Sequence, residues 1–268
     1  ITGDSVEVAG AVAYEVGIAK SSGEVISGFD FEKMNYEEKI SAVEKGNVFA
    51  RVSPEQKFQI IEILQKKYTV GYLGDGINDA PALKLANVAI VVNGASDVAR
   101  EASDLILLQQ DLKVIIDGIE EGRKTFVNTS KYIKATLSSN FGNFYAVAIA
   151  SLMIDYLPML PVQILLVNLL SDFPMISIAT DNVEKKEIKN PCAYNNTEIV
   201  IIATFLGIVS TVFDLLLFSI FRKESPEILR TAWFIESILT ELVLIFSIRT
   251  KSFIFKSRSK PSGIIFPS

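Results

Sequence analysis

The chain has 268 residues and a net charge of −5, from 26 Lys and Arg against 31 Asp and Glu. This acidic balance argues against a nucleic-acid partner. The sequence has no His and one Cys, which excludes Ser-His-Asp and Cys-His catalysis, His-ligated metals, disulfide frameworks and multi-Cys zinc sites. The chemistry left open is that of carboxylates, amides, Lys, hydroxyls and hard cations such as Mg²⁺.

Charge is distributed unevenly along the chain. Residues 1–137 hold 15 basic and 20 acidic residues, whereas residues 138–268 hold 11 of each, clustered between long apolar runs. We therefore expect four regions: a soluble domain at 1–110, a long mixed helix at 111–137, membrane helices at 138–250 and a cytoplasmic tail at 251–268. The first residue is not Met and no signal-peptide layout follows it, so we expect a piece of a longer protein.

Helices and strands alternate in the soluble part. Strands are expected at residues 47–52, 69–73, 88–92 and 104–108. Ser53, Pro54 and Gln56 predict a capped helix start, and we expect this helix to turn Phe58 and Ile61, together with Leu64, towards the core. Continuous apolar strands separated by helices predict a parallel α/β sheet, which binds ligands at the carboxyl ends of its strands.

The turn after residues 69–73 has the sequence GDGINDAP at 74–81. Its two glycines let backbone approach a ligand, and Asp75 and Asp79 lie close enough to repel each other without a nearby cation. Asn78 could donate to a phosphoryl oxygen. The alternative is an ordinary Gly/Asp turn in which an Asp caps the next helix. The complete string at a strand end favours the metal site.

This string carries a family resemblance. GDGINDAPAL at 74–83 resembles the hinge motif of P-type ATPases, ion pumps with a haloacid-dehalogenase-like phosphorylation domain. TGD at 2–4 and SPEQK at 53–57 resemble two further motifs of the family, in the family order. The resemblance implies a partial α/β haloacid-dehalogenase-like (Rossmannoid parallel sheet) domain joined to an α-helical transmembrane bundle.

The resemblance also assigns roles at a catalytic Mg²⁺. Asp75 would hold the ion that bridges to the phosphoryl group. Asp79 would orient the waters of that ion and the loop itself.

Five further residues would bind ATP and the transferred phosphoryl group. Lys57 and Asn78 would offset the charge of that group. Thr2 would hydrogen-bond a phosphoryl oxygen, and Gly3 and Asp4 would help position nucleotide and loop. Alone, the TGD string and Lys57 are weak signals, since Lys57 could be a solvated helix lysine.

The family's phosphorylated Asp lies in a DKTGT string, which this sequence does not contain. The resemblance places that string, the TGES-bearing actuator domain, the nucleotide-binding domain and the first four membrane helices upstream of residue 1. Two more membrane helices would follow residue 268. We therefore expect this chain alone to be inactive.

Four membrane spans are expected, at 139–157, 160–180, 199–221 and 231–248, and each has about the 20 residues needed to cross hydrocarbon. The loop at 181–198 and the tail after residue 248 are rich in Lys and Arg, which places them, and the soluble part, on the cytoplasmic side. Arg222, Lys223 and Arg230 would lie outside, as an exception. The chain would be a multi-pass protein of the cell membrane.

Polar residues inside these spans predict a cation site. Asn140 and Asn143 share one helix face, as do Asn168 and Asp172, and Pro174 frees backbone carbonyls. Amide, carboxylate and carbonyl oxygens suit a hard cation. The alternative is that these residues form hydrogen bonds between helices. For Asn140 or Asn143 alone, this alternative and the cation site are equally plausible. For Asn168 with Asp172 and Pro174, the cation site is favoured.

A narrower resemblance concerns the ion. SSNFGN at 138–143 and LPMLP at 157–161 resemble bacterial magnesium-transporting P-type ATPases. Calcium pumps carry Glu where this chain has Asn143. However, Glu241 stands where magnesium pumps should have Gln and calcium pumps have Glu. Asp214 resembles a seventh-helix Asp of the magnesium group, with interior pairing as the alternative role.

The expected function is part of an ATP-driven pump that imports Mg²⁺ through an aspartyl-phosphate cycle, with Mg²⁺ and ATP as cofactors and the lipid bilayer as surroundings. Transport of calcium or another cation is the first alternative. A membrane-anchored phosphatase of the same fold and a non-catalytic sensor are the others.

Overall fold

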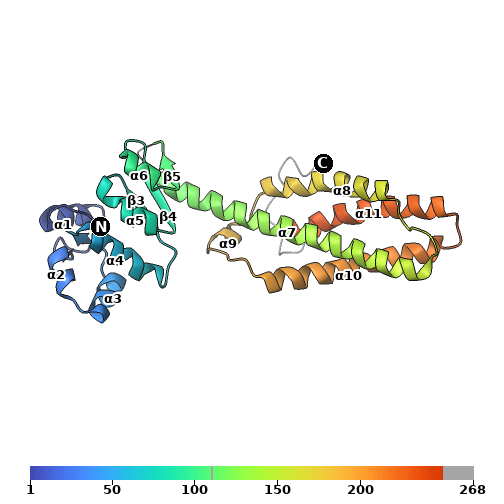
Figure 1. Cartoon of the computed structure of the whole chain (residues 1–268), viewed down its shortest axis with the longest axis horizontal. Coiled ribbons are helices and arrows are strands. Elements are labelled where there is room, and N and C mark those ends of the chain that lie inside the picture. The colour runs from blue at the N-terminus through green and yellow to red at the C-terminus, as the bar shows by residue number, and fades with distance from the viewer. Residues whose placement is uncertain (110, 250–268) are drawn as a thin grey trace. The chain divides into compact units, whose positions relative to one another are not determined.

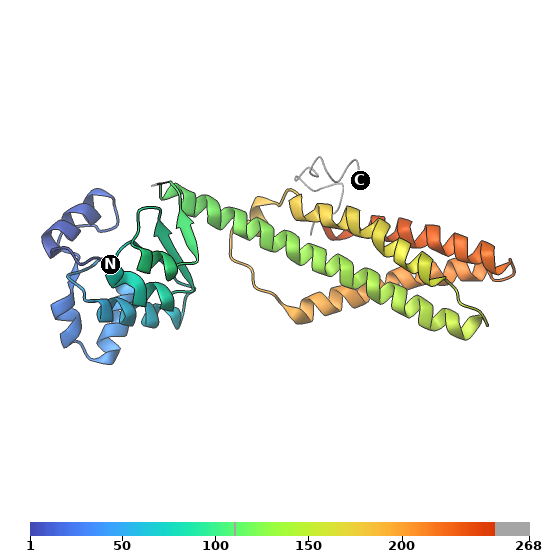
Figure 2. The same cartoon turned by 45° about the horizontal axis from the view of Figure 1, so that its top comes forward.

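The computed structural model describes residues 1–109 and 111–249, so the expected tail at 251–268 lies outside the described residues. The chain divides into two units, Ile1–Val114 and Ile115–Ser268, which are described one at a time. Figures 1 and 2 show the helices and strands of each unit from two directions.

The first unit alternates short helices and strands. In chain order they are α1 (Val6–Glu15), β1 (Ile26–Ser27), α2 (Gly28–Lys33), α3 (Tyr36–Lys45), β2 (Phe49–Ala50), α4 (Pro54–Gln65), β3 (Gly71–Gly74), η1 (Ile77–Asp79), α5 (Ala80–Leu85), β4 (Val88–Val92), α6 (Asp97–Glu101) and β5 (Leu105–Leu107).

All strand pairs in this unit are parallel, as the apolar runs predicted. β1 pairs with β2, and a three-stranded sheet has the order β3-β4-β5. The TGD segment runs beside β2, because the Thr2 amide donates to the Phe49 carbonyl at 2.9 Å and the Arg51 amide donates to the Asp4 carbonyl at 3.0 Å. Parallel strands direct their carboxyl ends to one edge, where ligands bind.

Helix α4 begins as the sequence predicted. Ser53 accepts from the Gln56 amide, and the Gln56 side chain accepts from the Ser53 amide, which is a capping box. The expected inward direction of Phe58 is wrong, since this ring is exposed. The helix packs between two apolar clusters, one containing Ile61 and the other Ile60 and Ile63, so its buried stripe is centred on these residues.

The second unit is a helix bundle. Its elements are α7 (Lys113–Met153), which begins two residues before the unit boundary, α8 (Pro161–Ile176), η2 (Ser177–Thr180), α9 (Lys185–Ile188), α10 (Asn196–Phe221) and α11 (Pro226–Arg249). Both views show the four long helices side by side (Figures 1 and 2). Helices α7 and α10 approach closely, because a Cβ at Gly207 would lie 2.9 Å from the Phe141 Cβ.

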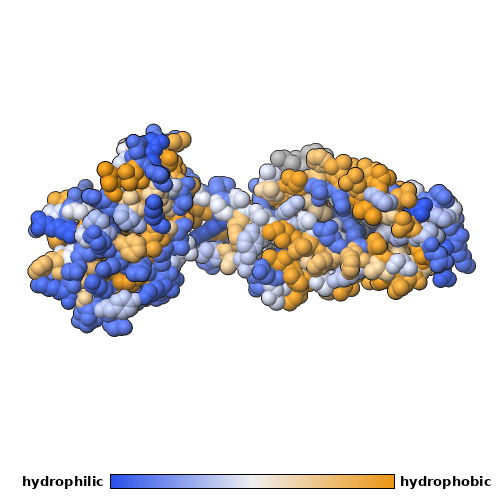
Figure 3. Space-filling view, viewed as in Figure 1, coloured by the Kyte–Doolittle hydropathy of each residue, from blue (hydrophilic) through white to orange (hydrophobic). Residues whose placement is uncertain are grey.

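Among the described residues, three helices are long and apolar enough to cross a membrane: Pro161–Thr180, Asn196–Phe221 and Pro226–Arg249. Hydrophobic side chains cover much of the bundle in the space-filling view (Figure 3). The fourth expected span, residues 139–157, falls mostly in the second half of α7, which runs unbroken through the expected stalk. That span stays a prediction.

Ion pairs gather at one end of the bundle. Lys131 pairs with Glu187 at 3.2 Å, and Arg249 pairs with Asp181 at 2.7 Å. At the opposite end, the Arg230 Nε donates to the Leu157 carbonyl at 2.9 Å. These ion pairs lie at the end that the sequence analysis expects to face the cytoplasm, and that orientation stays a prediction.

Candidate functional site

The turn after β3 folds a carboxylate back over the end of its own strand. Gly74 closes β3, and a Cβ there would lie 2.7 Å from the Asp79 Cβ, so only glycine fits without a shift. The Ser96 amide, at the start of α6, donates to the Asp75 carbonyl at 3.0 Å and fixes the turn.

The Asp79 carboxylate is buried and accepts hydrogen bonds from four donors. Its Oδ1 accepts from the Lys57 Nζ at 2.7 Å and from the Tyr72 hydroxyl at 2.8 Å. Its Oδ2 accepts from the backbone amides of Asp75 and Gly76, each at 3.3 Å. One side chain therefore connects α4, β3 and the turn.

These contacts change the acidity of the groups involved. Burial raises the pKa of Asp79, but the Lys57 ammonium and the Tyr72 hydroxyl outweigh it, so the pKa of Asp79 lies below its ordinary value. Burial and the neighbouring Asp79 raise the pKa of Tyr72. At neutral pH the carboxylate is thus ionised and the phenol keeps the proton that it donates.

Asp75 and Asn78 lie beside this cluster and are exposed. Within the described residues, neither side chain makes a hydrogen bond. An exposed, unengaged carboxylate at the carboxyl end of β3 fits Mg²⁺, which takes one or two protein carboxylates and keeps several waters. No set of three Asp, Glu, His or Cys suited to a metal occurs in the described part of the chain.

The TGD segment reaches the same edge. The Thr2 Oγ1 donates to the Asp4 carboxylate at 2.8 Å and accepts from the Asp4 amide at 3.1 Å. The Val52 amide donates to the Thr2 carbonyl at 3.3 Å, so the segment runs beside the residues that lead into α4, the helix that carries Lys57.

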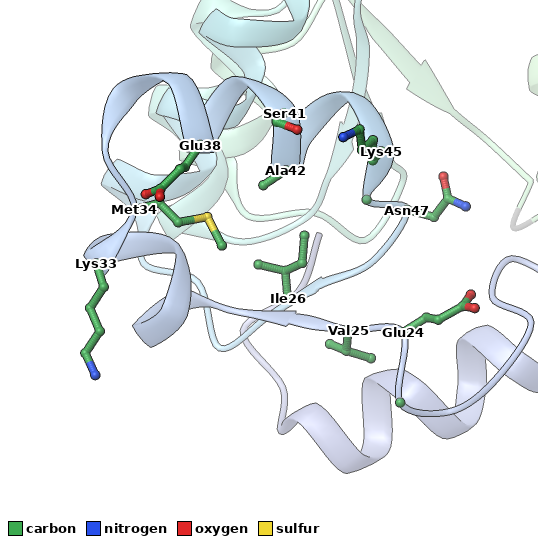
Figure 4. Close-up of a pocket in the computed structure, with 12 residues that line it drawn as sticks. Glu24, Val25, Ile26, Lys33, Met34, Glu38, Ser41, Ala42, Lys45 and Asn47 are labelled. Atoms are coloured by element: carbon green, nitrogen blue, oxygen red, sulfur yellow. The ribbon is translucent and has the colours of Figure 1, made fainter.

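A separate cavity of about 810 Å³ opens in the same unit between β1 and α3. Val25, Ile26 and Met34 form part of its wall, and the charged side chains of both signs around it include Lys45 and Glu38 (Figure 4). None of the expected site residues lines it.

In the second unit, Glu241 lies at the centre of a polar cluster with α7. The Ser139 hydroxyl and the Asn143 amide both donate to its Oε1, the amide at 3.0 Å. Its Oε2 is buried and accepts no hydrogen bond among the described residues. The structure thus joins Asn143 and Glu241, and Ser139 is an addition that the sequence analysis missed.

The remaining expected cation residues lie elsewhere. Asn140, Asn168 and Asp172 are exposed, and no hydrogen bond joins their side chains to another described residue. Asn143 and Asn168 both line a cavity of about 220 Å³, whose walls also include Trp233 and Ser237. Asn140 and Asp172 are therefore exposed away from this cavity, whereas Asn168 is exposed and also borders the cavity that Asn143 lines.

Asp214 has an internal partner. Its Oδ1 accepts from the Trp233 indole at 2.6 Å. The Glu236 Oε1 accepts from the Thr240 hydroxyl at 2.7 Å. The pairing alternative for Asp214 therefore has structural support. Sequence analysis missed Trp233, although a lone Trp in an apolar span calls for a partner for its N–H.

The first prediction concerns acid stability. Because the pKa of Asp79 lies below the ordinary value of about 3.9, its ionised form stabilises the fold above that pH, and this stabilisation is lost as the pH falls through the folded-state pKa. We expect Asp79→Asn to lose stability near pH 7 and the deficit to shrink below about pH 4. Urea unfolding followed by pulse proteolysis at each pH measures this, with exposed Asp117→Asn as control. A deficit that persists unchanged at low pH would contradict it.

The second prediction uses Trp233, the single Trp of the chain. Asp214→Leu leaves the buried indole N–H without its acceptor, which costs about 1–3 kcal/mol of stability and shifts Trp emission to shorter wavelength. Asp214→Asn keeps an acceptor and should stay near wild type, as should exposed Phe213→Leu. Emission spectra and thermal unfolding in detergent provide the measurement. If Asp214→Leu kept the Trp emission spectrum of the wild type, the hydrogen bond between Trp233 and Asp214 would be refuted.

Two family models match the sequence. One is described as haloacid dehalogenase-like hydrolase and matches residues 1–87. The other is described as Cation transporting ATPase, C-terminus, and matches residues 156–267. One match falls in each unit.

The curated relatives that match this chain are also cation-transporting ATPases. The magnesium-transporting ATPase, P-type 1 of Escherichia coli (strain K12) is 41% identical over 259 residues, which are 94% of this chain and 29% of that relative. The protein of the same name from Salmonella typhimurium (strain 14028s / SGSC 2262) is 40% identical over 94% of this chain and 28% of its own. The calcium-transporting ATPase of Bacillus subtilis (strain 168) is 34% identical over 95% of this chain and 30% of its own length.

The chain thus spans less than a third of the length of these relatives. Because the match to the Escherichia coli relative covers 94% of this chain, it includes parts of both units. The chain therefore belongs to the P-type ATPases.

Proposed function

We propose that this chain is part of an ATP-driven pump that moves Mg²⁺ across the cell membrane. The observation that carries the proposal is the meeting of Lys57, Asp79 and the 75–76 turn at the carboxyl end of β3. The names of two relatives, both magnesium-transporting ATPases, support the choice of ion.

At the phosphoryl site, Asp75 is the direct Mg²⁺ ligand, because its carboxylate is exposed and makes no hydrogen bond within the described chain. The ion supplies positive charge to the phosphoryl oxygens when it is bound. Asp79 holds the turn and Lys57 instead, since both of its oxygens already accept hydrogen bonds. Asp79 therefore acts on the ion through the loop that presents Asp75.

The site for ATP and the transferred phosphoryl group is completed by Lys57, Asn78 and the TGD segment. Lys57 reaches it from α4 with a side chain that is only 12% exposed, so its charge is poorly screened. Thr2 and Asp4 form a compact hydrogen-bonded turn beside β2, and Gly3 keeps backbone accessible between them. Each of these groups supplies a donor or a charge for a phosphate oxygen.

The nucleophilic Asp comes from a segment outside these 268 residues, which contain no DKTGT string. The sheet supports this arrangement, because β3 pairs with β4 on one side and with no described strand on the other. A parallel strand at that open edge would end beside Asp75.

In the bundle, Asn140, Asn168 and Asp172 are the direct ligands of the transported ion. All three side chains are exposed, and Asn168 also lines the cavity of about 220 Å³, so a neighbouring segment can supply further ligands. One carboxylate and two amides suit Mg²⁺, which retains waters.

Calcium transport is the second candidate, and one observation favours it. The buried Glu241 lies beside Asn143 with one oxygen that accepts no hydrogen bond from the described residues. A second carboxylate would suit Ca²⁺, which takes six to eight oxygen ligands. The Bacillus subtilis relative is named a calcium-transporting ATPase.

The phosphoryl site is tested in a full-length protein that contains this chain. Asp75→Asn should abolish phosphoenzyme formation from ATP, because the direct carboxylate ligand of Mg²⁺ is lost. Acid-stable incorporation of labelled phosphate measures it, with exposed Asp97→Asn as control. Normal phosphoenzyme in Asp75→Asn would overturn the assignment.

The transport site is tested in the same protein. Asp172→Asn should remove the dependence of ATP turnover on the transported cation while the fold stays intact, because the one charged ligand is lost. Turnover is measured with Mg²⁺–ATP held constant for the phosphoryl site while added Mg²⁺ or Ca²⁺ is varied, with Asp155→Asn at the bundle end as control. Unchanged stimulation by the added ion would refute the site, and stimulation of the wild type by added Ca²⁺ but not by added Mg²⁺ would favour the second candidate.

A further inference from the structure

Tyr72 occupies the second position of β3 and is buried in the apolar cluster that contains Ile61 and Val91. Its ring fills the core as a Phe ring would. The hydroxyl is different, because a buried phenol requires a hydrogen-bond partner. That partner is the Asp79 Oδ1, at 2.8 Å.

The same oxygen accepts from Lys57, at 2.7 Å. A Lys that contacts a phosphoryl group must weaken its ion pair with the carboxylate to which it was bonded before. If Lys57 were the only donor to Asp79 Oδ1, this movement would leave a buried anionic oxygen unpaired, which costs about 1–3 kcal/mol or more. The Tyr72 hydroxyl remains bonded to that oxygen when Lys57 moves.

The contact between Tyr72 and Asp79 depends on Gly74. A Cβ at Gly74 would lie 3.1 Å from the Tyr72 Cε1 and 2.7 Å from the Asp79 Cβ. The chain thus leaves room at the strand end for these two side chains to meet. Sequence alone shows only an aromatic residue in an apolar strand.

We propose that Tyr72 is a positioning residue for phosphoryl transfer: its hydroxyl holds the Asp79 carboxylate in place and offsets part of its charge, so that Lys57 is released to the phosphoryl group. This inference rests on the proposed function. It makes Tyr72 act through Asp79 and Lys57, without touching substrate.

The variant Tyr72→Phe removes one oxygen and keeps the ring. Exposed Tyr14→Phe, on α1, is the matched control, because Tyr14 is 60% exposed and its hydroxyl makes no hydrogen bond with the site residues in the described part of the chain. The first measurement uses this chain in detergent. Lys57 is acylated with a small anhydride, and the rate is quantified by mass spectrometry of the modified peptide.

Without the hydroxyl, Asp79 binds Lys57 more tightly, so acylation of Lys57 in Tyr72→Phe should slow by about fivefold, as expected for one lost hydrogen bond. Other lysines and the Tyr14→Phe chain should react at wild-type rates. An unchanged or faster rate at Lys57 in Tyr72→Phe would overturn the inference. This readout does not depend on pump activity.

The second measurement uses the full-length protein and orthovanadate as a phosphoryl analogue. Tyr72→Phe should raise the vanadate concentration for half-inhibition of ATP turnover on the order of fivefold to tenfold, while thermal stability changes little. Equal vanadate inhibition in wild type and Tyr72→Phe would overturn the inference. A wild-type protein without ATP turnover would instead refute the proposed function, and the acylation rate would still decide the role of Tyr72 towards Lys57.

Discussion

The buried carboxylate of Asp79 is the interaction on which the first unit's site depends. Four donors from α4, β3 and the turn converge on its two oxygens. Burying a carboxylate costs free energy unless its oxygens accept hydrogen bonds, so the buried Asp79 fixes the positions of its four donors. The two neighbouring acids therefore have different roles. Asp79 stabilises the turn and the position of Lys57, and the exposed Asp75 is available to bind a cation.

The bundle applies the same rule in a membrane setting. Polar side chains inside apolar helices cost free energy, and two of the enclosed carboxylates are paired: Asp214 with Trp233, and one oxygen of Glu241 with Ser139 and Asn143. The other Glu241 oxygen and the Ser237 hydroxyl are buried without a hydrogen-bond partner among the described residues. Asn140, Asn168 and Asp172 make no side-chain hydrogen bond to the described helices either, and they are exposed. Polar groups that the bundle itself does not pair are the ones best suited to an ion and to a further segment of protein.

Sequence reasoning succeeded where a pattern is local. The cap of α4, the parallel strands and the GDGIND turn each follow from a few adjacent residues, and the structure confirms the cap and the strands. It failed where tertiary contacts decide. Phe58 was expected inside, but two separate clusters shift the buried stripe of α4. The Tyr72 hydroxyl, the Trp233–Asp214 bond and the separation of Asn143 from Asn140 all depend on helices or strands distant in sequence, which no spacing rule reveals.

The central claim is that Asp79 organises the site while Asp75 meets the metal. The most direct measurement is an experimental structure of the full-length protein with Mg²⁺ and a phosphoryl analogue bound. The account predicts an Asp75 oxygen on the ion, Asp79 still bonded to the Tyr72 hydroxyl and to the amides of the turn, and Lys57 turned towards the analogue. Direct coordination of the ion by Asp79, with Asp75 in solvent, would contradict it.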